Sequence, residues 1–169
     1  MQLLSRLKMV GILYIKVRDV ASGKVIRTIC KRNSITYDAG NIVRQLLSQR
    51  ATDALAVELQ LGSMRFGTDS TPAARTDTGL YNEISATRGQ LTDDAKLDGG
   101  AGEITLHAVM ESGVGNGNTY REAGLFTRGP AWDSEVGGSL MCWARQIHPA
   151  VEKSSAIALE YDWTLQFTA

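Results

Sequence analysis

Apolar and polar residues alternate without a break over residues 157–167. The apolar members of this run are Ile157, Leu159, Tyr161, Trp163, Leu165 and Phe167. Because successive side chains of a β-strand point to opposite faces, the pattern predicts a strand with one buried and one exposed face. Trp163 and Phe167 are therefore expected in the core of the fold.

Further runs of residues are also predicted to be strands, and those at residues 11–17 and 103–110 show the same two-residue period. The runs cover residues 11–17, 25–31, 59–66, 83–91, 103–110, 120–126 and 140–147. A Ser-Gly pair separates the first two runs and favours a hairpin turn. After a break at residues 33–36, Asp38 is placed to cap a helix. The apolar stripe of this helix is Ile42, Val43, Leu46 and Leu47.

Together these elements predict a mainly β protein, a two-sheet antiparallel β-sandwich of jelly-roll-like form with one short α-helix near residues 38–50. Neither a linker nor an internal repeat divides the sequence, so residues 1–169 are expected to form a single domain. Residues 1–10 are expected as an N-terminal arm. Two polar stretches, residues 68–80 and 92–102, are expected as long surface loops, the first of them a second arm.

The composition fits one domain with a sizeable core, because 43% of the 169 residues are hydrophobic. No stretch approaches the length of a membrane span, and the first ten residues lack the apolar region of a signal peptide. We therefore expect no membrane association. Cys30 and Cys142 are isolated, which favours a reducing compartment. A disulfide between them stays open as an alternative if their strands are neighbours.

The formal net charge is zero, but the charges are unevenly distributed. Residues 1–50 contain ten Lys and Arg and two acidic residues, whereas the remainder contains eight basic and sixteen acidic residues. This split indicates a partner for the basic part. The basic residues are spaced along strands with few aromatic residues for stacking, so nucleic acid is not favoured. We expect Arg18, Arg27 and Lys31 to meet an acidic surface on a neighbouring copy; the alternative is a solvated face without a partner.

The sequence carries no recognisable catalytic or metal-binding motif. His107 falls on the polar, exposed face of its strand and His148 lies at a strand end, without metal-ligand spacing. The Gly-rich residues 113–118 lack the motif of a phosphate-binding loop and are expected as a turn. The acidic residues within 92–102 lack the spacing of a calcium loop. We therefore predict no catalytic residue, no cofactor and no bound metal.

Glu122 is the charged residue that stands out, because it leads directly into the apolar segment Ala123-Gly124-Leu125-Phe126. A carboxylate so close to a core strand needs backbone N–H groups or a cation. We expect Glu122 to form an ion pair or to cap a turn, and not to act in catalysis. Gly124 is expected where another part of the chain approaches closely. Phe126 completes this structural segment.

Several segments follow one another in a distinctive order. They are Asn33-Ser34-Ile35-Thr36 before the helix, Phe66-Gly67-Thr68 with the loop that ends at Leu80, Glu122-Ala123-Gly124-Leu125-Phe126, Ala144-Arg145, Lys153-Ser154-Ser155, and Trp163-Thr164-Leu165-Gln166-Phe167. In this order the chain resembles a family of structural proteins from the virions of tailed bacteriophages. The resemblance covers residues 33–167, and an insertion at residues 128–136 departs from it.

The resemblance implies a non-enzymatic virion protein that assembles symmetrically in the tail, baseplate or fibre-attachment region. The alternative location is the head surface, as a capsid decoration or cement protein. The implied partners are copies of itself, in a homo-oligomer, and other virion proteins, after assembly in the host cytoplasm. The resemblance carries over no catalytic residues.

Two other classes remain as rivals. A carbohydrate-binding module also uses a sandwich fold, but it needs an exposed aromatic face, for which the prediction offers Trp132. An enzyme is disfavoured by the missing catalytic motifs.

Overall fold

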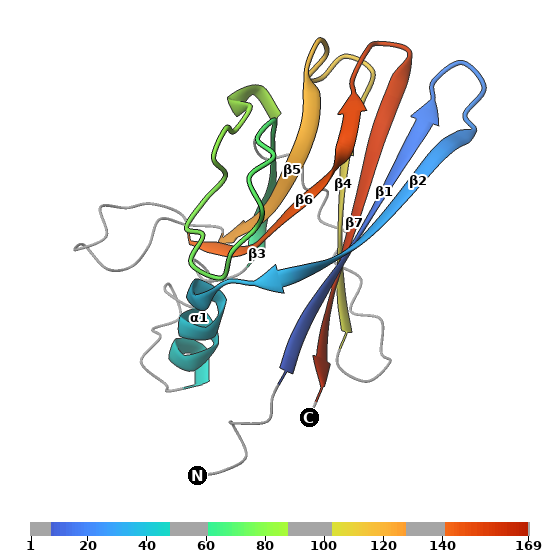
Figure 1. Ribbon diagram of the computed structural model, residues 1–169. Helices are drawn as coiled ribbons and strands as arrows, with labels where there is room; N and C mark the ends of the chain where they lie inside the picture. The colour runs from blue at the N-terminus through green and yellow to red at the C-terminus, as the bar shows by residue number, and fades with distance from the viewer. Residues whose placement is uncertain (1–7, 48–60, 88–102, 128–140, 169) are drawn as a thin grey trace.

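The structure is a computed structural model that describes residues 8–47, 61–87, 103–127 and 141–168 (Figure 1). Its strands are β1 (Lys8–Asp19), β2 (Val25–Ile35), β3 (Leu61–Gly67), β4 (Glu103–Met110), β5 (Thr119–Thr127), β6 (Cys142–Glu152) and β7 (Ile157–Thr168). One helix, α1 (Tyr37–Leu47), follows β2, and a short 3₁₀ turn covers Ser85–Thr87. None of the helices in these ranges is long and apolar enough to cross a bilayer.

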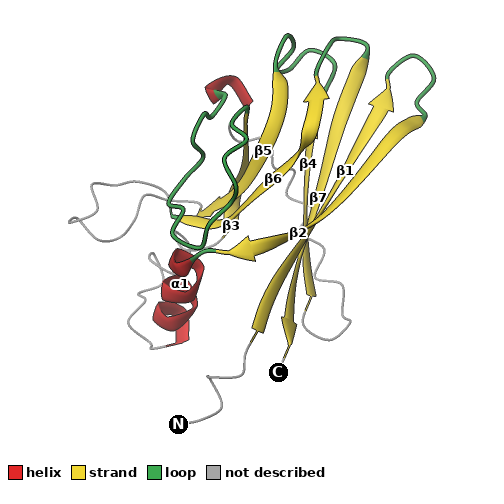
Figure 2. Cartoon of the chain, in the orientation of Figure 1, coloured by secondary structure: helices red, strands yellow, loops and turns green. Residues whose placement is uncertain are grey.

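The strands form two antiparallel sheets that β2 connects (Figure 2). One sheet has the order β2-β1-β7-β4, and the other has the order β3-β5-β6. The last residues of β2, Ser34 and Ile35, pair with Arg145 and Ala144 of β6 and so join the sheets. The predicted mainly β, two-sheet antiparallel sandwich with one short helix is confirmed.

The core lies between the two sheets and follows the alternation seen in the sequence. β1 and β7 pair in a register that places Leu13 opposite Trp163 and Ile15 opposite Tyr161, and all four side chains are fully buried. Phe66 of β3 packs against Tyr161 across the sandwich, with ring centroids 4.4 Å apart. Burial of each large apolar side chain contributes about 1.5–3 kcal/mol before entropy is counted. Trp163 is therefore a core residue as predicted, whereas the side chain of Phe167 lies outside the described part of the chain.

The predicted break at residues 33–36 is wrong, because β2 continues to Ile35. Asn33 is buried inside the sandwich, where its Oδ1 accepts a hydrogen bond from Trp163 Nε1 at 3.3 Å. Gly11, opposite Asn33 in the register, leaves the space that the amide occupies, since a Cβ there would collide with it. A polar residue that reads as a loop signal is thus tolerated in the strand because its side chain has a buried partner.

The predicted cap of the helix is also corrected. α1 begins at Tyr37, and Thr36 is the residue that caps it, since the Ala39 N–H donates to Thr36 Oγ1 at 3.4 Å. The same hydroxyl donates to the carbonyl groups of Cys142 and Trp143, which fixes the start of α1 against β6. Asp38 lies in the first turn, where a carboxylate is favourable next to the helix N-terminus.

Other boundaries differ from the prediction in smaller ways. β1 begins at Lys8, inside the predicted arm of residues 1–10, and the rest of that arm lies outside the described residues. The predicted strand 83–91 is wrong in its described part: Glu83 makes a single bridge to Gly67, and the 3₁₀ turn follows. The loop 92–102 lies outside the described residues. The turn after β4 is confirmed, with Gly115 and Gly117 at φ +66° and +80°.

Candidate functional site

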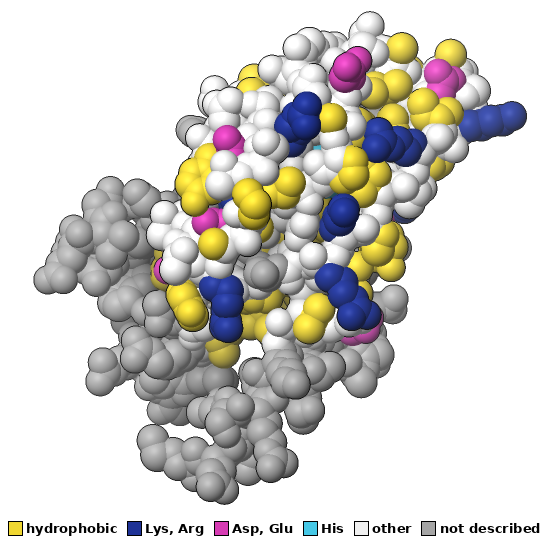
Figure 3. All heavy atoms as spheres, viewed as in Figure 1, with side chains coloured by type: hydrophobic (Ala, Val, Ile, Leu, Met, Phe, Trp, Pro, Cys, Tyr) yellow, Lys and Arg dark blue, Asp and Glu magenta, His cyan; other side chains and the backbone are white. Residues whose placement is uncertain are grey.

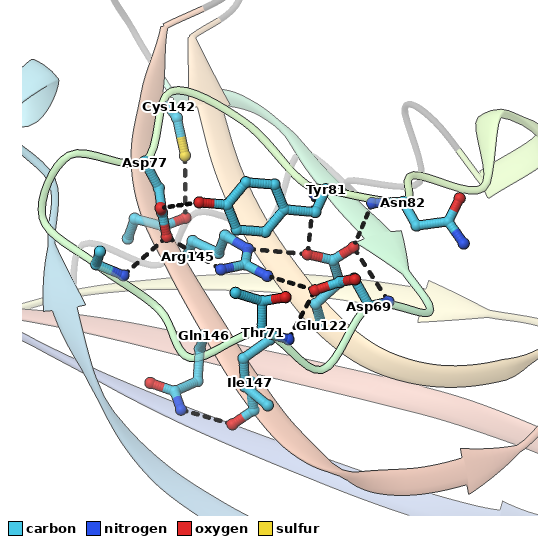
Figure 4. A network of polar contacts seen from close by, with 12 residues as sticks. Asp69, Thr71, Asp77, Tyr81, Asn82, Glu122, Cys142, Arg145, Gln146 and Ile147 are labelled. Atoms are coloured by element: carbon cyan, nitrogen blue, oxygen red, sulfur yellow. Dashed lines mark hydrogen bonds and ion pairs between the residues drawn. The ribbon is translucent and has the colours of Figure 1, made fainter.

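A fully buried arginine, Arg145 of β6, is the centre of the most extensive polar network in the described residues (Figure 4). Its Nε donates to Glu122 Oε2 at 2.8 Å, and its Nη1 donates to Asp77 Oδ2 at 3.0 Å. Its Nη2 lies 3.6 Å from Asp69 Oδ1. We call these four residues the Arg145 network. Glu122 and Asp77 are buried, so both charges depend on the guanidinium for compensation.

Strand register explains how the network is built. Gly124 lies opposite Arg145 in the β5–β6 pair, and Glu122, two residues earlier, projects on the same face. A Cβ at Gly124 would lie 2.8 Å from the Phe126 ring and 3.0 Å from Leu80, so only glycine leaves room there. The close approach predicted at Gly124 is therefore present, and the loop that contains Leu80 is the neighbour. Phe126 itself is buried, under the guanidinium of Arg65 at 4.9 Å.

Glu122 also caps the loop that follows β3. Its carboxylate accepts hydrogen bonds from the backbone N–H groups of Asn82 at 2.9 Å, Tyr81 at 3.3 Å and Asp69 at 3.4 Å. One buried carboxylate thus binds both ends of the loop and the arginine. Both structural roles that the sequence suggested, ion pair and turn cap, are fulfilled by Glu122. Its cation is Arg145 and not its sequence neighbour Arg121, which is exposed.

Tyr81 covers the network from outside. Its ring stacks on the Arg145 guanidinium, 4.3 Å from the ring centroid, and its hydroxyl donates to Asp77 Oδ1 at 3.0 Å. That hydrogen bond to Asp77, together with the negative charge, raises the pKa of Tyr81. Burial opposes the charged form of Arg145, but the hydrogen bonds to Glu122 and Asp77 outweigh it and raise the pKa of Arg145. The Arg145 guanidinium therefore stays charged at neutral pH.

The loop from residue 68 to residue 84, which we call the clamped loop, includes residues 68–80, which were predicted as a long surface loop or arm. Asp77 of this loop is instead bound by Arg145, and the backbone N–H of Ala74 donates to the same carboxylate at 2.8 Å. Sequence reasoning missed Arg145, Asp77, Asp69 and Tyr81. The available signal was an arginine directly after the apolar run Met141–Ala144, because a charge in such a run requires a partner.

The basic residues expected to meet a partner, Arg18, Arg27 and Lys31, differ in the contacts that they make within the chain. Arg18 of β1 donates to Glu160 of β7 at 2.5 Å, so its acidic partner belongs to its own chain and the expected contact with a neighbouring copy is not needed to explain it. Lys16 similarly pairs with Asp162 at 2.8 Å. Arg27 donates to the carbonyl of Ala150 at 3.1 Å. Lys31 makes no ion pair with the described residues.

The two histidines occupy different environments. His107 is half-buried and its Nδ1 pairs with Asp162, so it is not simply exposed as predicted. His148 lies inside β6 and not at a strand end; it is 3% exposed, with its ring 6.0 Å from Tyr161. Burial, with the nearby charges of Arg27 and Lys31, lowers the pKa of His148 to about 4. In the described ranges, no three His, Cys, Asp or Glu side chains are placed to hold a metal ion.

The cysteines are both free thiols, so the alternative of a disulfide is wrong. Cys30 is exposed on β2, and Cys142 is buried on β6. Burial raises the pKa of the Cys142 thiol to about 12, which leaves it protonated and unreactive.

Three comparisons place this geometry against known proteins. No family model, no curated protein and no solved structure matches the chain.

Proposed function

We propose that this chain is a non-enzymatic structural protein of a tailed-bacteriophage virion that assembles with copies of itself and with other virion proteins. The proposed location is the tail, baseplate or fibre-attachment region. The proposal rests first on the resemblance of the ordered segments. The structure adds one observation, the Arg145 network, that makes those segments physically interdependent.

Segments that are far apart in the sequence meet in this network. Glu122 begins one of the resembling segments, Arg145 ends another, and Asp69 and Asp77 belong to a third. A buried charge cluster requires all of its members, since loss of one leaves the others uncompensated. The resembling segments are therefore joined in one structural network. A shared network supports the resemblance more than separate short matches would.

The charged groups of the Arg145 network have a structural role. Glu122 is saturated by Arg145 and the N–H groups of the clamped loop, and Asp77 by Arg145, Tyr81 and Ala74. Groups held in this way fix the shape of a surface loop, and a preorganised loop loses little entropy when it binds a partner. This favours a docking role over acid–base chemistry.

Labelled antibodies against this chain, combined with imaging of intact particles, test the proposal. We expect stoichiometric amounts of the chain in purified particles and symmetric density at the tail, baseplate or fibre-attachment region. Density on the head surface would instead support the alternative of a capsid decoration protein. Absence from purified particles of a phage that encodes the chain would contradict both.

A carbohydrate-binding module is the second candidate, favoured by exposed aromatic rings. Trp132 lies outside the described residues, but Tyr37 and Tyr81 are 56% and 59% exposed. Each ring has a guanidinium over it, from Arg75 at 4.9 Å and Arg145 at 4.3 Å. A glycan array with the wild type and the Tyr37→Ala variant tests this candidate; binding that disappears in the variant would favour it over assembly.

A further inference from the structure

The cations of the β1–β2 hairpin differ in whether the chain itself neutralises them. On β1, Lys16 and Arg18 pair with Asp162 and Glu160. On β2 and its turn, Lys24, Arg27, Lys31 and Arg32 make no ion pair with the described residues. We call these four residues the β2 cations. Figure 3 shows Lys and Arg side chains spread over the face turned to the viewer, with Asp and Glu side chains among them.

The edge of the sheet that carries the β2 cations is largely free. β2 pairs with β6 through Ser34 and Ile35, and, among the described residues, positions 25–33 have a strand partner on one side, β1. Exposed apolar side chains accompany the cations at this end: Val25 is 42% exposed and Ile26 is 61% exposed. Apolar side chains between cations suit a protein surface, since a phosphate backbone gives them nothing to bury against.

The opposite edge of the same sheet has the complementary character. β4 is the last strand, and in the described ranges no strand pairs with its outer side. Exposed carboxylates, Glu103 and Glu111, stand at its two ends, and the residues between them include no Lys or Arg. Glu103 accepts a hydrogen bond from Gln166, and neither carboxylate makes an ion pair with the described residues. The edge also lacks the lysine or proline that commonly prevents edge-to-edge pairing.

The two edges match in length as well as in charge. Glu103 and Glu111 are eight residues apart, and so are Lys24 and Arg32. If the two edges come from different copies and lie antiparallel, Glu103 of one copy meets Arg32 of the other, and Glu111 meets Lys24. Val109 then lies near Ile26. Glu103 and Arg32 both lie on the outer face of their sheet, opposite Gln166 and Ile12 in the registers.

From these observations we infer that the β4 edge of one copy docks against the β2 edge of a second copy. Such a contact joins two different surfaces, so repetition generates a ring when the rotation closes. The inference rests on the proposed function, because it names the self-contact by which the protein assembles. It also explains why the β2 cations have no acidic partner among the described residues, while Lys16 and Arg18 of β1 are neutralised within the chain.

Sedimentation of the purified full chain at low ionic strength tests the inference with reciprocal charge reversals. Lys24→Glu with Arg32→Glu reverses the β2 edge, and Glu103→Lys with Glu111→Lys reverses the β4 edge. We expect each double variant to weaken self-association by about tenfold or more, because attraction becomes repulsion. All four changes in one chain should restore it. Added salt should weaken the wild-type contact.

The control is Arg121→Glu, measured beside Arg32→Glu alone. Arg121 is exposed on β5, in the other sheet. The control should associate like the wild type, and the Arg32→Glu chain should associate less. Circular dichroism should show that every variant is folded.

Separate outcomes overturn the inference and the proposed function. Self-association that survives both reversals, or that the fourfold variant does not regain, overturns the β4–β2 contact and leaves assembly by another surface. A wild-type chain that is monomeric at every concentration and yet enters particles also overturns it. A chain absent from particles overturns the proposed function itself.

Discussion

Two sets of ion pairs in this protein use the same residue types in opposite environments. The Lys16–Asp162 and Arg18–Glu160 pairs lie on the outer face of one sheet, where the side chains of Lys16 and Arg18 remain 39% and 36% exposed. The Arg145–Glu122 pair lies in the other sheet with both side chains at 0% exposure. Water solvates Lys16 and Arg18 whether or not their pairs form, whereas the charges of the Arg145–Glu122 pair are compensated only by groups inside the protein.

The two environments separate the charges that specify the fold from those that do not. The exposed pairs adjust the surface, while the Arg145 network decides where the clamped loop lies.

Removal of the guanidinium should produce the largest loss. Arg145→Met keeps much of the volume but leaves Glu122 and Asp77 buried without their cation, at a cost of about 3–5 kcal/mol in the free energy of unfolding. Chemical denaturation with a cooperative fit measures it. A loss of less than about 1 kcal/mol would show that the buried pair behaves like an exposed one. Arg121→Met, at an exposed position on β5, is the matched control.

Acidification tests His148, a buried group that lies near the positive charges of Arg27 and Lys31. Folding lowers the pKa of His148 from 6.5 to about 4, so the unfolded chain takes up the proton first as the pH falls. Stability should therefore be full above pH 6.5 and should fall toward pH 4, by on the order of 3 kcal/mol. Among the described residues, the charges that act on His148 are those of Arg27 and Lys31, and the ring of Tyr161 lies beside it.

The control for this pH dependence is His148→Gln, which stays neutral throughout. Its unfolding free energy should vary less between pH 6.5 and pH 4 than that of the wild type. Identical pH profiles for the two chains would rule out His148 as the titrating group.

Overpacking at the edge of the network should cost less. Gly124→Val places side-chain atoms against Phe126 and Leu80, and we expect a loss of about 1–3 kcal/mol. Thermal melting measures the change. Gly40→Val is unsuitable as a control, because Gly40 lies in α1 and valine differs from glycine in helix propensity. Gly79→Ala is the control, since it adds a Cβ where nothing lies within 4 Å. An unchanged melting temperature for Gly124→Val would contradict the close approach.

The smallest effect belongs to the exposed pairs. Arg18→Ala removes the contact with Glu160 and should cost about 0.2–1 kcal/mol, a difference that salt reduces. Denaturation at low and high salt measures it. A loss as large as that of Arg145→Met would abolish the distinction between the two sets.

The sequence predicted the elements whose stability comes from regular burial. The alternation of β7 was decisive because every second side chain faces the core, and Leu159, Tyr161, Trp163 and Leu165 are fully buried. Glu122 and Gly124 were recognised because a charge and a glycine are unusual in such a strand. Each of these signals is local, so a single segment was enough to detect it.

What the sequence could not predict depends on contacts between distant segments. Asn33 looked like a break because its partner, Trp163, is 130 positions away. The clamped loop looked like an arm because Asp77 and Arg145 are 68 positions apart. Polar residues in loops carry no periodicity, and only the folded register of β5 and β6 shows that they meet a buried cation.

Amide hydrogen exchange at Asn82 tests the central claim most directly. Its N–H donates to Glu122 Oε1 at 2.9 Å, so it should exchange slowly in the wild type, unlike an exposed loop amide. Arg145→Met should make it exchange much faster, while the Trp163 amide in β7 remains protected if the chain stays folded. Fast exchange at Asn82 in the wild type, or protection unchanged in Arg145→Met, would contradict the claim that the Arg145 network holds the clamped loop.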